Sequence, residues 1–139
     1  MQSEAAAPLD VVGAVIHNAA GEVLCALRGP GMSMPGVWEF PGGKLAAGEA
    51  PEEALVREIR EELACVIRVE ALLVDHLHPA APRPIRLRTY GAVLVSGQPT
   101  PLEHAELRWV AAAELHRLDW APADGPTVAW LQGAIPASH

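Results

Sequence analysis

Residues 43–65 read GKLAAGEAPEEALVREIREELAC, and this stretch holds the clearest helical pattern in the chain. Proline is well tolerated in the first turn of a helix, so we expect a helix to begin near Pro51. The apolar residues that follow recur at helical spacing along one flank: Leu55, Val56, Ile59 and Leu63. The pattern predicts a helix packed against a sheet.

The same stretch is strongly acidic. Residues 49–62 carry −4 of the net charge of −7, because only Arg57 and Arg60 oppose six glutamates there: Glu49, Glu52, Glu53, Glu58, Glu61 and Glu62. Glu58, Glu61 and Glu62 are spaced so that three carboxylates share one helix face. Like charges this close raise each other's pKa unless a cation lies among them, and Mg²⁺ prefers carboxylate oxygens.

A glutamate-rich helix face is more often simply solvated, so the metal site needs support from its context. Gly42 and Gly43 lie just upstream, and glycine lets the backbone approach a metal–phosphate group closely. Glu49 precedes the helix and is able to orient Arg57 through a charge-assisted pair. This context favours the metal site.

The whole chain has the composition of one ordinary domain. Its 139 residues are 50% hydrophobic, which is enough to build a core without disulfides. Cys25 and Cys65 lie in apolar surroundings and are expected to be reduced core residues. The net charge of −7 argues against a nucleic acid polymer or an anionic membrane as partner. Without a bilayer-length apolar run or a signal peptide, the sequence predicts a cytoplasmic protein.

Strand-like composition surrounds the helix. Apolar and β-branched residues predict strands at 9–17, 21–28, 38–40, 65–77, 85–96 and 107–110. Residues 9–17 have the pattern of a strand buried on both faces, and a turn at 18–21 makes 21–28 its expected hairpin partner. Short helices are expected at 111–118 and 127–134, with a loop between them. We assign 1–8 to a fraying N-terminus, 9–135 to one α+β domain and 136–139 to a C-terminal tail.

The acidic stretch also resembles a known signature. All the fixed glycine and charged positions of the Nudix hydrolase signature, as far as Glu62, match: Gly43, Glu49, Arg57, Glu58, Glu61 and Glu62. Ala64 stands where the family usually has a glycine that ends the helix, so we expect a shifted cap or a small loss of stability. The resemblance implies an α/β/α sandwich with a central mixed β-sheet and the Nudix loop–helix–loop.

Further motifs resemble the MutT-like branch, which contains CTP pyrophosphohydrolases and 8-oxo-dGTP diphosphatases. WEFPGGK at 38–44 is typical of that branch, as is Arg28 at the end of a strand. Glu103, six residues before Trp109, resembles the loop glutamate that completes the metal site. Asp124 ends an APAD motif at the position where an Asn or Asp contacts the nucleobase.

The resemblance implies hydrolysis of a nucleoside triphosphate to a monophosphate and diphosphate, with Mg²⁺ or Mn²⁺ as cofactor. The implied metal ligands are the Gly42 carbonyl, Glu58, Glu62 and Glu103, with Glu61 in support. Arg57 and Glu49 would orient the site, and Glu58, Glu61 and Glu103 are each candidates for the general base. Arg28, Lys44 and Asp124 are candidate substrate contacts, although surface pairing is an equal alternative for Arg28. We expect a monomer or homodimer that removes mutagenic nucleotides.

Asp124 bears on the choice of nucleotide. An ionised carboxylate accepts a hydrogen bond and suits the cytosine amino group, whereas a protonated one donates to a keto oxygen and suits 8-oxo-dGTP. Capping of a helix near Pro126 is the structural alternative. A nucleotide-binding module without catalysis is the competing class, and it predicts loss of the metal carboxylates, which are intact here. Trp38 and Phe40 are expected in the core, with stacking on the substrate as the alternative. His76, His78 and His104 lack the neighbours of a transition-metal site.

Overall fold

The strands form two sheets in the part of the chain that the computed structural model describes, residues 7–133. The central sheet has the order β4–β1–β6–β5, with β1 (Leu9–Ile16), β4 (Gly42–Lys44), β5 (Val66–His78) and β6 (Ile85–Ser96). It is mixed, because β1 runs parallel to β6 and the other pairs are antiparallel. The second sheet is antiparallel and contains β2 (Glu22–Leu27), β3 (Trp38–Glu39) and β7 (Glu106–Ala111).

Residues 1–6 and 134–139 lie outside the described range. These undescribed residues include most of the N-terminus assigned to 1–8, the end of the domain assigned to 9–135 and the tail assigned to 136–139. No helix among the described residues is long and apolar enough to cross a membrane.

The predicted central helix is confirmed as α1 (Pro51–Leu63). Its first turn is held by the Glu53 carboxylate, which accepts a hydrogen bond from the Ala50 amide at 3.2 Å. Leu55, Ile59 and Leu63 are fully buried in a core shared with β1, β5 and β6, and Val56 packs at its edge. The apolar flank therefore faces the central sheet.

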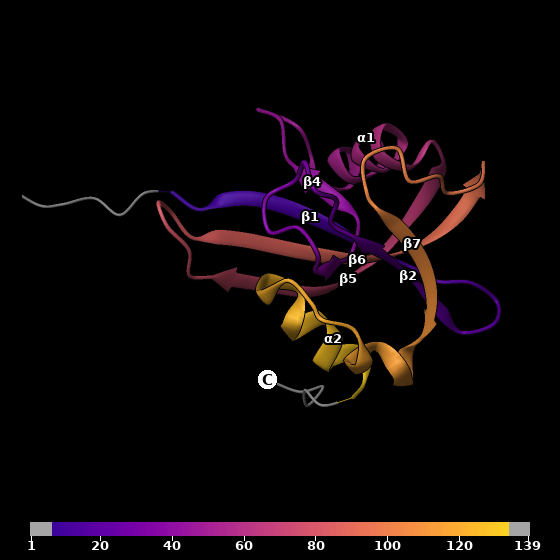
Figure 1. Ribbon diagram of the computed structural model, residues 1–139. Helices are drawn as coiled ribbons and strands as arrows, with labels where there is room; N and C mark the ends of the chain where they lie inside the picture. Colours follow the sequence, from indigo (N-terminus) through magenta and orange to yellow (C-terminus); the bar gives the residue numbers. More distant parts are fainter. Residues whose placement is uncertain (1–6, 134–139) are drawn as a thin grey trace, which may run out of the picture.

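Two cores lie on the two sides of β1. Val12, Ala14 and Ile16 face α1, whereas Val15 joins a second core with Trp38, Phe40 and residues near α2 (Gly125–Leu131). Figure 1 shows α1 and α2 on opposite sides of the strands. Burial on both faces is confirmed for residues 12–16, whereas 9–11 are partly buried and His17 is exposed. The α/β/α layering of an α+β fold is also confirmed.

The predicted hairpin between residues 9–17 and 21–28 is wrong. The turn itself is present, with Asn18 Oδ1 accepting hydrogen bonds from the Ala20 and Glu22 amides. However, β1 already has β4 and β6 on its two edges, so β2 leaves for the second sheet. Of the predicted hairpin, a single isolated bridge between His17 and Val23 is present.

Three further local predictions need correction. Residues 42–44, for which no strand is predicted, form β4 and pair with Val11–Gly13 of β1, because glycine allows the two backbones to meet closely. A Cβ at Gly42 would overlap the Val12 carbonyl oxygen. The helix expected at 111–118 is a 3₁₀ helix, η1 (Ala112–Arg117), and a second one, η2 (Pro122–Asp124), lies in the expected loop. Helix α2 starts at Gly125 rather than at 127.

Ala64 itself takes the left-handed conformation that glycine would take. Its φ is 55° and its ψ is 35°, and its amide bonds to the Arg60 carbonyl at 3.1 Å. The helix therefore ends at Leu63 without a shifted cap, and the strain stays in the Ala64 backbone.

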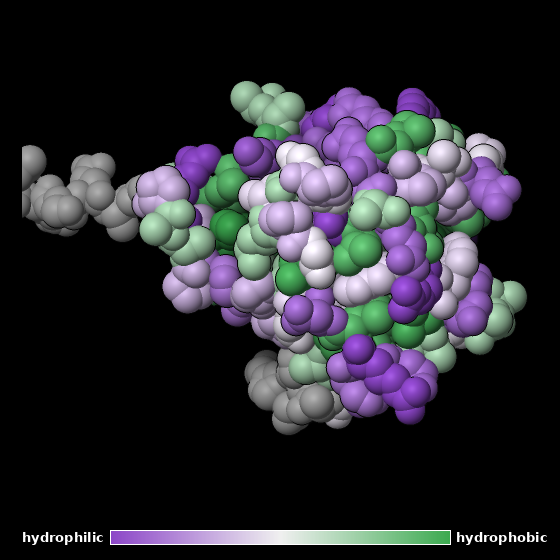
Figure 2. All heavy atoms as spheres, in the orientation of Figure 1, coloured by the Kyte–Doolittle hydropathy of each residue, from purple (hydrophilic) through white to green (hydrophobic). Residues whose placement is uncertain are grey.

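Both cysteines are buried and free, as the sequence predicts. Burial raises the pKa of the Cys25 thiol to about 12, so it is unreactive at neutral pH. On the face seen in Figure 2, hydrophilic residues dominate the surface over α1, and hydrophobic residues are confined to small patches.

Candidate active site

Arg57 holds the N-terminal part of the acidic segment together. Its guanidinium donates two hydrogen bonds to Glu49, at 2.8 and 2.9 Å, in the forked geometry of a charge-assisted pair. It also donates to Glu58 at 3.1 Å, Glu61 at 3.1 Å and the Lys44 carbonyl at 3.2 Å. These bonds and the Ala46 amide lower the pKa of Glu49 to about 2. Arg57 thus links the loop after β4 to the face of α1.

Glu58 lies directly against the glycine pair of β4. A Cβ at Gly43 would overlap its carboxyl group, so the glycine leaves the space that the carboxylate fills. Partial burial raises the pKa of Glu58, and the negative charges of Glu61 and Glu103 add to that effect. The site therefore gathers negative charge where the backbone is most open.

Glu62 is the buried member of the cluster. Only 8% of the residue is exposed, and its Oε1 atom has no hydrogen-bond partner. Desolvation raises the pKa of Glu62 to about 8, with further contributions from Glu39, Glu58 and Glu103. A buried carboxylate oxygen without a partner is costly, and a cation is the partner that its surroundings would accept.

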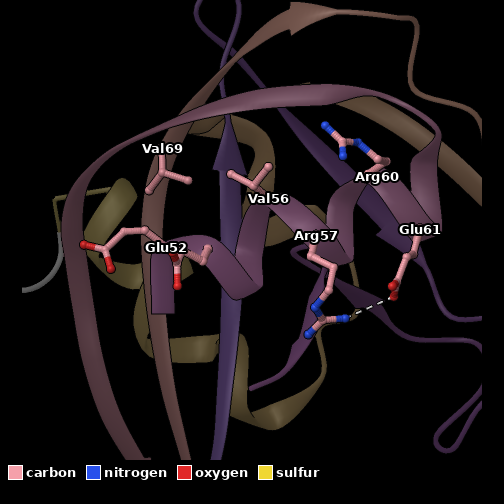
Figure 3. A pocket seen from close by; sticks show the side chains of 7 residues that line it. Glu52, Val56, Arg57, Arg60, Glu61 and Val69 are labelled. Carbon is pink, nitrogen blue, oxygen red and sulfur yellow. Dashed lines mark hydrogen bonds and ion pairs between the residues drawn. The ribbon is translucent and has the colours of Figure 1, made fainter. Parts of the chain in front are cut away.

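Glu61 does not join Glu58 and Glu62 on the inner side of α1. Its side chain is 56% exposed and pairs with Arg57, as Figure 3 shows. Together they border a shallow groove between α1 and Val69 of β5. The predicted face of three carboxylates is therefore split, because the i+3 and i+4 positions diverge around the helix.

Glu103 comes from the loop between β6 and β7. It is exposed, and its charge raises the pKa of both Glu58 and Glu62, which places it on their side of the molecule. Within residues 7–133, no three His, Cys, Asp or Glu side chains lie as a group that could hold a metal ion by themselves. An open set of carboxylates around an unpaired oxygen fits Mg²⁺, which keeps several of its waters.

A pocket of about 400 Å³ reaches Glu62 of this cluster and is lined by residues of both sheets. Glu62, Gly42, Gly43 and Lys44 line one part of it, and Phe40, Leu87 and Asp124 line another. Lys44 is an exposed residue of this lining. The volume is in the range of small-molecule sites.

Asp124 is buried at the pocket wall, with 6% exposure. It occupies the N-cap position of α2, but its side chain makes no capping hydrogen bond. Desolvation raises the pKa of Asp124 well above its usual range, and the Glu39 charge adds to the shift. The Phe40 backbone amide and the Arg28 charge oppose it only in part. Burial therefore favours the protonated form of this carboxyl.

Arg28 is largely occupied by protein partners. It pairs with the Glu39 carboxylate and donates to the backbone carbonyl and, at 2.8 Å, to the hydroxyl of Ser33. It still lines the pocket. Its guanidinium orders the loop between β2 and β3 as well as the pocket wall.

The family follows from a comparison with known domains. A NUDIX domain profile matches residues 7–131. The chain belongs to the Nudix family. This membership makes it a hydrolase of the class that acts on phosphoric anhydrides, and the Nudix segment is the β4–loop–α1 unit described above.

Relatives of this Nudix chain are similar over nearly its whole length. A Mycobacterium tuberculosis protein named "Putative 8-oxo-dGTP diphosphatase 2" is 38% identical over 130 residues, which cover 92% of this chain and 90% of the relative. CTP pyrophosphohydrolase of Escherichia coli is 35% identical over 118 residues, covering 85% and 87%. The solved structure of MutT, a Nudix hydrolase from methicillin-resistant Staphylococcus aureus, is 40% identical with a TM-score of 0.75, covering 91% of this chain and 97% of that chain.

Glu39 and its contact with His104 were missed in the sequence analysis. Glu39 interacts with two acidic groups of the site, because its negative charge raises the pKa of both Glu62 and Asp124. It also contacts His104, which is fully buried, at 2.8 Å. Alternation on β3 was the available signal, because Trp38 and Phe40 are buried in the core and the residue between them must point the other way.

The aromatic residues and histidines follow the prediction more closely. Trp38 and Phe40 are both buried, and Phe40 also lines the pocket and stacks on Trp120 at 4.7 Å between ring centroids. His76 and His78 lie on one side of β5 with ring centroids 5.8 Å apart. His104 is remote from them in the sequence and pairs with Glu39 instead.

Proposed function

We propose that this Nudix hydrolase is a Mg²⁺-dependent nucleoside triphosphate pyrophosphohydrolase, which converts the triphosphate to a monophosphate and diphosphate. The observation that carries the proposal is the unpartnered, buried Oε1 of Glu62 at the edge of a pocket that continues to Asp124. Such a layout matches a ligand with a charged polyphosphate at one end and a hydrogen-bonding base at the other.

The residues proposed to hold the cation are the Gly42 carbonyl, Glu58, Glu62 and Glu103, with Glu61 in support. A bound Mg²⁺ (or Mn²⁺) neutralises phosphate charge and makes water a better nucleophile at neutral pH. Glu62 and Glu58 have raised pKa values in its absence, which is the electrostatic condition that a cation relieves.

Arg57 and Glu49 are proposed to orient the site rather than to react. Their forked ion pair fixes the loop after β4 against α1, and Arg57 then restrains Glu58 and Glu61. Water attack on phosphorus also needs a proton acceptor. Glu58, Glu61 and Glu103 are the candidates, and Glu58 is the one that lies against the Gly43 backbone.

We propose a cytidine-type or damaged (deoxy)nucleotide as the preferred substrate. The raised pKa of Asp124 removes the argument for cytosine that rests on an ionised carboxylate. In its protonated form, however, the carboxyl donates one hydrogen bond and accepts another, which also suits the adjacent ring-nitrogen acceptor and amino donor of the cytosine edge. The same carboxyl donates to a keto oxygen, and this observation keeps 8-oxo-dGTP as the second candidate. Lys44 and Arg28, which both line the pocket, are proposed substrate contacts, with Lys44 suited to the phosphates.

A Nudix-fold module that binds nucleotides without cleaving them is the competing proposal. It would have no need for a buried, unpartnered Glu62 carboxyl whose ionisation destabilises the fold. The distinguishing experiment is product analysis with Mg²⁺ over a panel of normal, methylated and oxidised nucleotides. Monophosphate and diphosphate in equal amounts support the enzyme, whereas tight binding without products supports the module.

A further inference from the structure

The loop that carries Glu103 is anchored to two different parts of the protein. On one side, the Thr100 and Leu102 amides donate to the last carbonyls of α1, those of Leu63 at 2.9 Å and Glu62 at 3.2 Å. On the other side, the Ala105 amide donates to the Leu27 carbonyl of β2 at 2.9 Å. Glu103 itself is exposed between these anchors.

His104 adds a side-chain anchor next to Glu103. Its imidazole is fully buried, and Nε2 lies 2.8 Å from the Glu39 carboxylate on β3. Carboxylate oxygens accept hydrogen bonds, so Nε2 is the donor. Among the side-chain hydrogen bonds of the described residues, this is the one that joins residues 97–105 to another part of the protein.

Glu39 is held firmly enough to serve as an anchor. Its other oxygen accepts from Arg28, and only 14% of its side chain is exposed. The backbone of Gly29 closes the loop from the same side, since a Cβ there would lie 2.9 Å from the Glu103 carbonyl oxygen. The loop therefore rests on a rigid surface formed by β2, β3 and the start of the loop between them.

Packing alone does not require a histidine at position 104. Its Nδ1 atom is buried with no hydrogen-bond partner, which costs stability. A leucine of similar size would fill the same space without an unpaired nitrogen. What leucine would lack is the directional bond to Glu39, which fixes the rotation of the loop and with it the direction of the neighbouring Glu103 side chain.

We propose that His104, hydrogen-bonded to Glu39, is a positioning residue that holds Glu103 toward Glu58 and Glu62 and so sets the affinity of the site for its divalent cation. The inference rests on the proposed function, because it takes Glu103 as a metal ligand. Outer residues that orient ligands in this way typically contribute about tenfold or more to metal affinity.

The test is Mn²⁺ binding without nucleotide, measured by electron paramagnetic resonance of the free ion. We compare the wild type with His104→Leu, His104→Gln and a matched control, His76→Leu, whose histidine lies on β5 and does not line the pocket. Circular dichroism and the melting temperature establish that each variant is folded. Should His104→Leu not fold, His104→Asn takes its place, because its shorter amide does not reach the Nε2 position.

We expect His104→Leu to weaken Mn²⁺ binding about tenfold, and His104→Gln, which keeps a donor near the Nε2 position, to recover most of that loss. His76→Leu should bind as the wild type does. In a Glu103→Gln background, His104→Leu should have little further effect, because the two residues act on the same contact. Unchanged binding in folded His104→Leu, or an undiminished effect in the Glu103→Gln background, overturns the proposal.

The same measurements separate this proposal from the proposed function. A wild type that binds Mn²⁺ but cleaves no nucleotide contradicts the enzyme, and the positioning role is then still decided by the variants. A wild type that binds no Mn²⁺ overturns both.

Discussion

Replacing Glu62 by glutamine should stabilise the metal-free protein while it removes a proposed metal ligand. The side chain is 8% exposed, its Oε1 is unpartnered, and burial near three other carboxylates raises its pKa from 4.5 to about 8. The folded protein therefore binds this proton more tightly than the unfolded chain does. Below about pH 4.5, Glu62 is protonated in both states and does not reduce the free energy of unfolding. As the pH rises from there to about 8, Glu62 lowers the free energy of unfolding progressively.

The size of the effect follows from the shift. At about 1.4 kcal/mol per pKa unit, the stability lost through Glu62 grows to on the order of 3 kcal/mol at neutral pH and is somewhat larger at pH 8. Glutamine has nearly the same shape and no charge, so we expect Glu62→Gln to raise the free energy of unfolding by about 3–4 kcal/mol at pH 8 and by almost nothing at pH 4.5.

Urea denaturation in the presence of a chelator, at both pH values, measures this difference. Added Mg²⁺ provides the matching control, because it should stabilise the wild type at pH 8 and leave Glu62→Gln unchanged. Activity should be lost in the variant. A variant that is no more stable than the wild type at pH 8 would show that Glu62 is not strained by burial, and the argument for a cation beside it would fall.

Three further substitutions test separate parts of the site. Ala64→Gly should raise the free energy of unfolding by about 0.5–1 kcal/mol, since it relieves the left-handed backbone, and calorimetry showing no gain would contradict this. Gly43→Ala should displace Glu58 and lower kcat by about 10²-fold with a near-normal melting temperature, whereas Gly31→Ala, in open space, should change neither. Asp124→Asn mimics the protonated carboxyl, so KM at pH 7 should stay within about threefold. The wild-type KM should rise at alkaline pH as Asp124 loses its proton, and a variant with the same rise would refute the base contact.

Much of the fold is visible in the sequence because α1 and the long strands have regular apolar patterns. Residues 85–96 form β6 with the predicted bounds, and Leu55, Ile59 and Leu63 face the sheet as their spacing requires. Pairing between strands is less visible. The turn after residues 9–17 favours a hairpin, but the order of the strands depends on which edges of β1 are already occupied. One edge is occupied by β4, which the sequence does not indicate because two of its three residues are glycines.

The site shows the same division. Spacing brought Glu49, Arg57 and Glu58 together, because their contacts lie within one loop and one helix. Glu39 and His104 are 65 positions apart, and nothing local in either segment indicates their contact. Burial of individual carboxylates was also beyond reach, since helical spacing alone does not tell which of Glu61 and Glu62 points inward.

The central claim is that this Nudix hydrolase cleaves nucleoside triphosphates to monophosphate and diphosphate with a divalent cation. The most direct measurement is the quantification of all phosphate products from CTP, methylated and oxidised nucleotides and 8-oxo-dGTP, with Mg²⁺ and with a chelator. We expect equal amounts of monophosphate and diphosphate, only with Mg²⁺, and fastest with a cytidine-type or damaged nucleotide. Release of nucleoside diphosphate and inorganic phosphate, or turnover that persists in the presence of the chelator, would contradict the account.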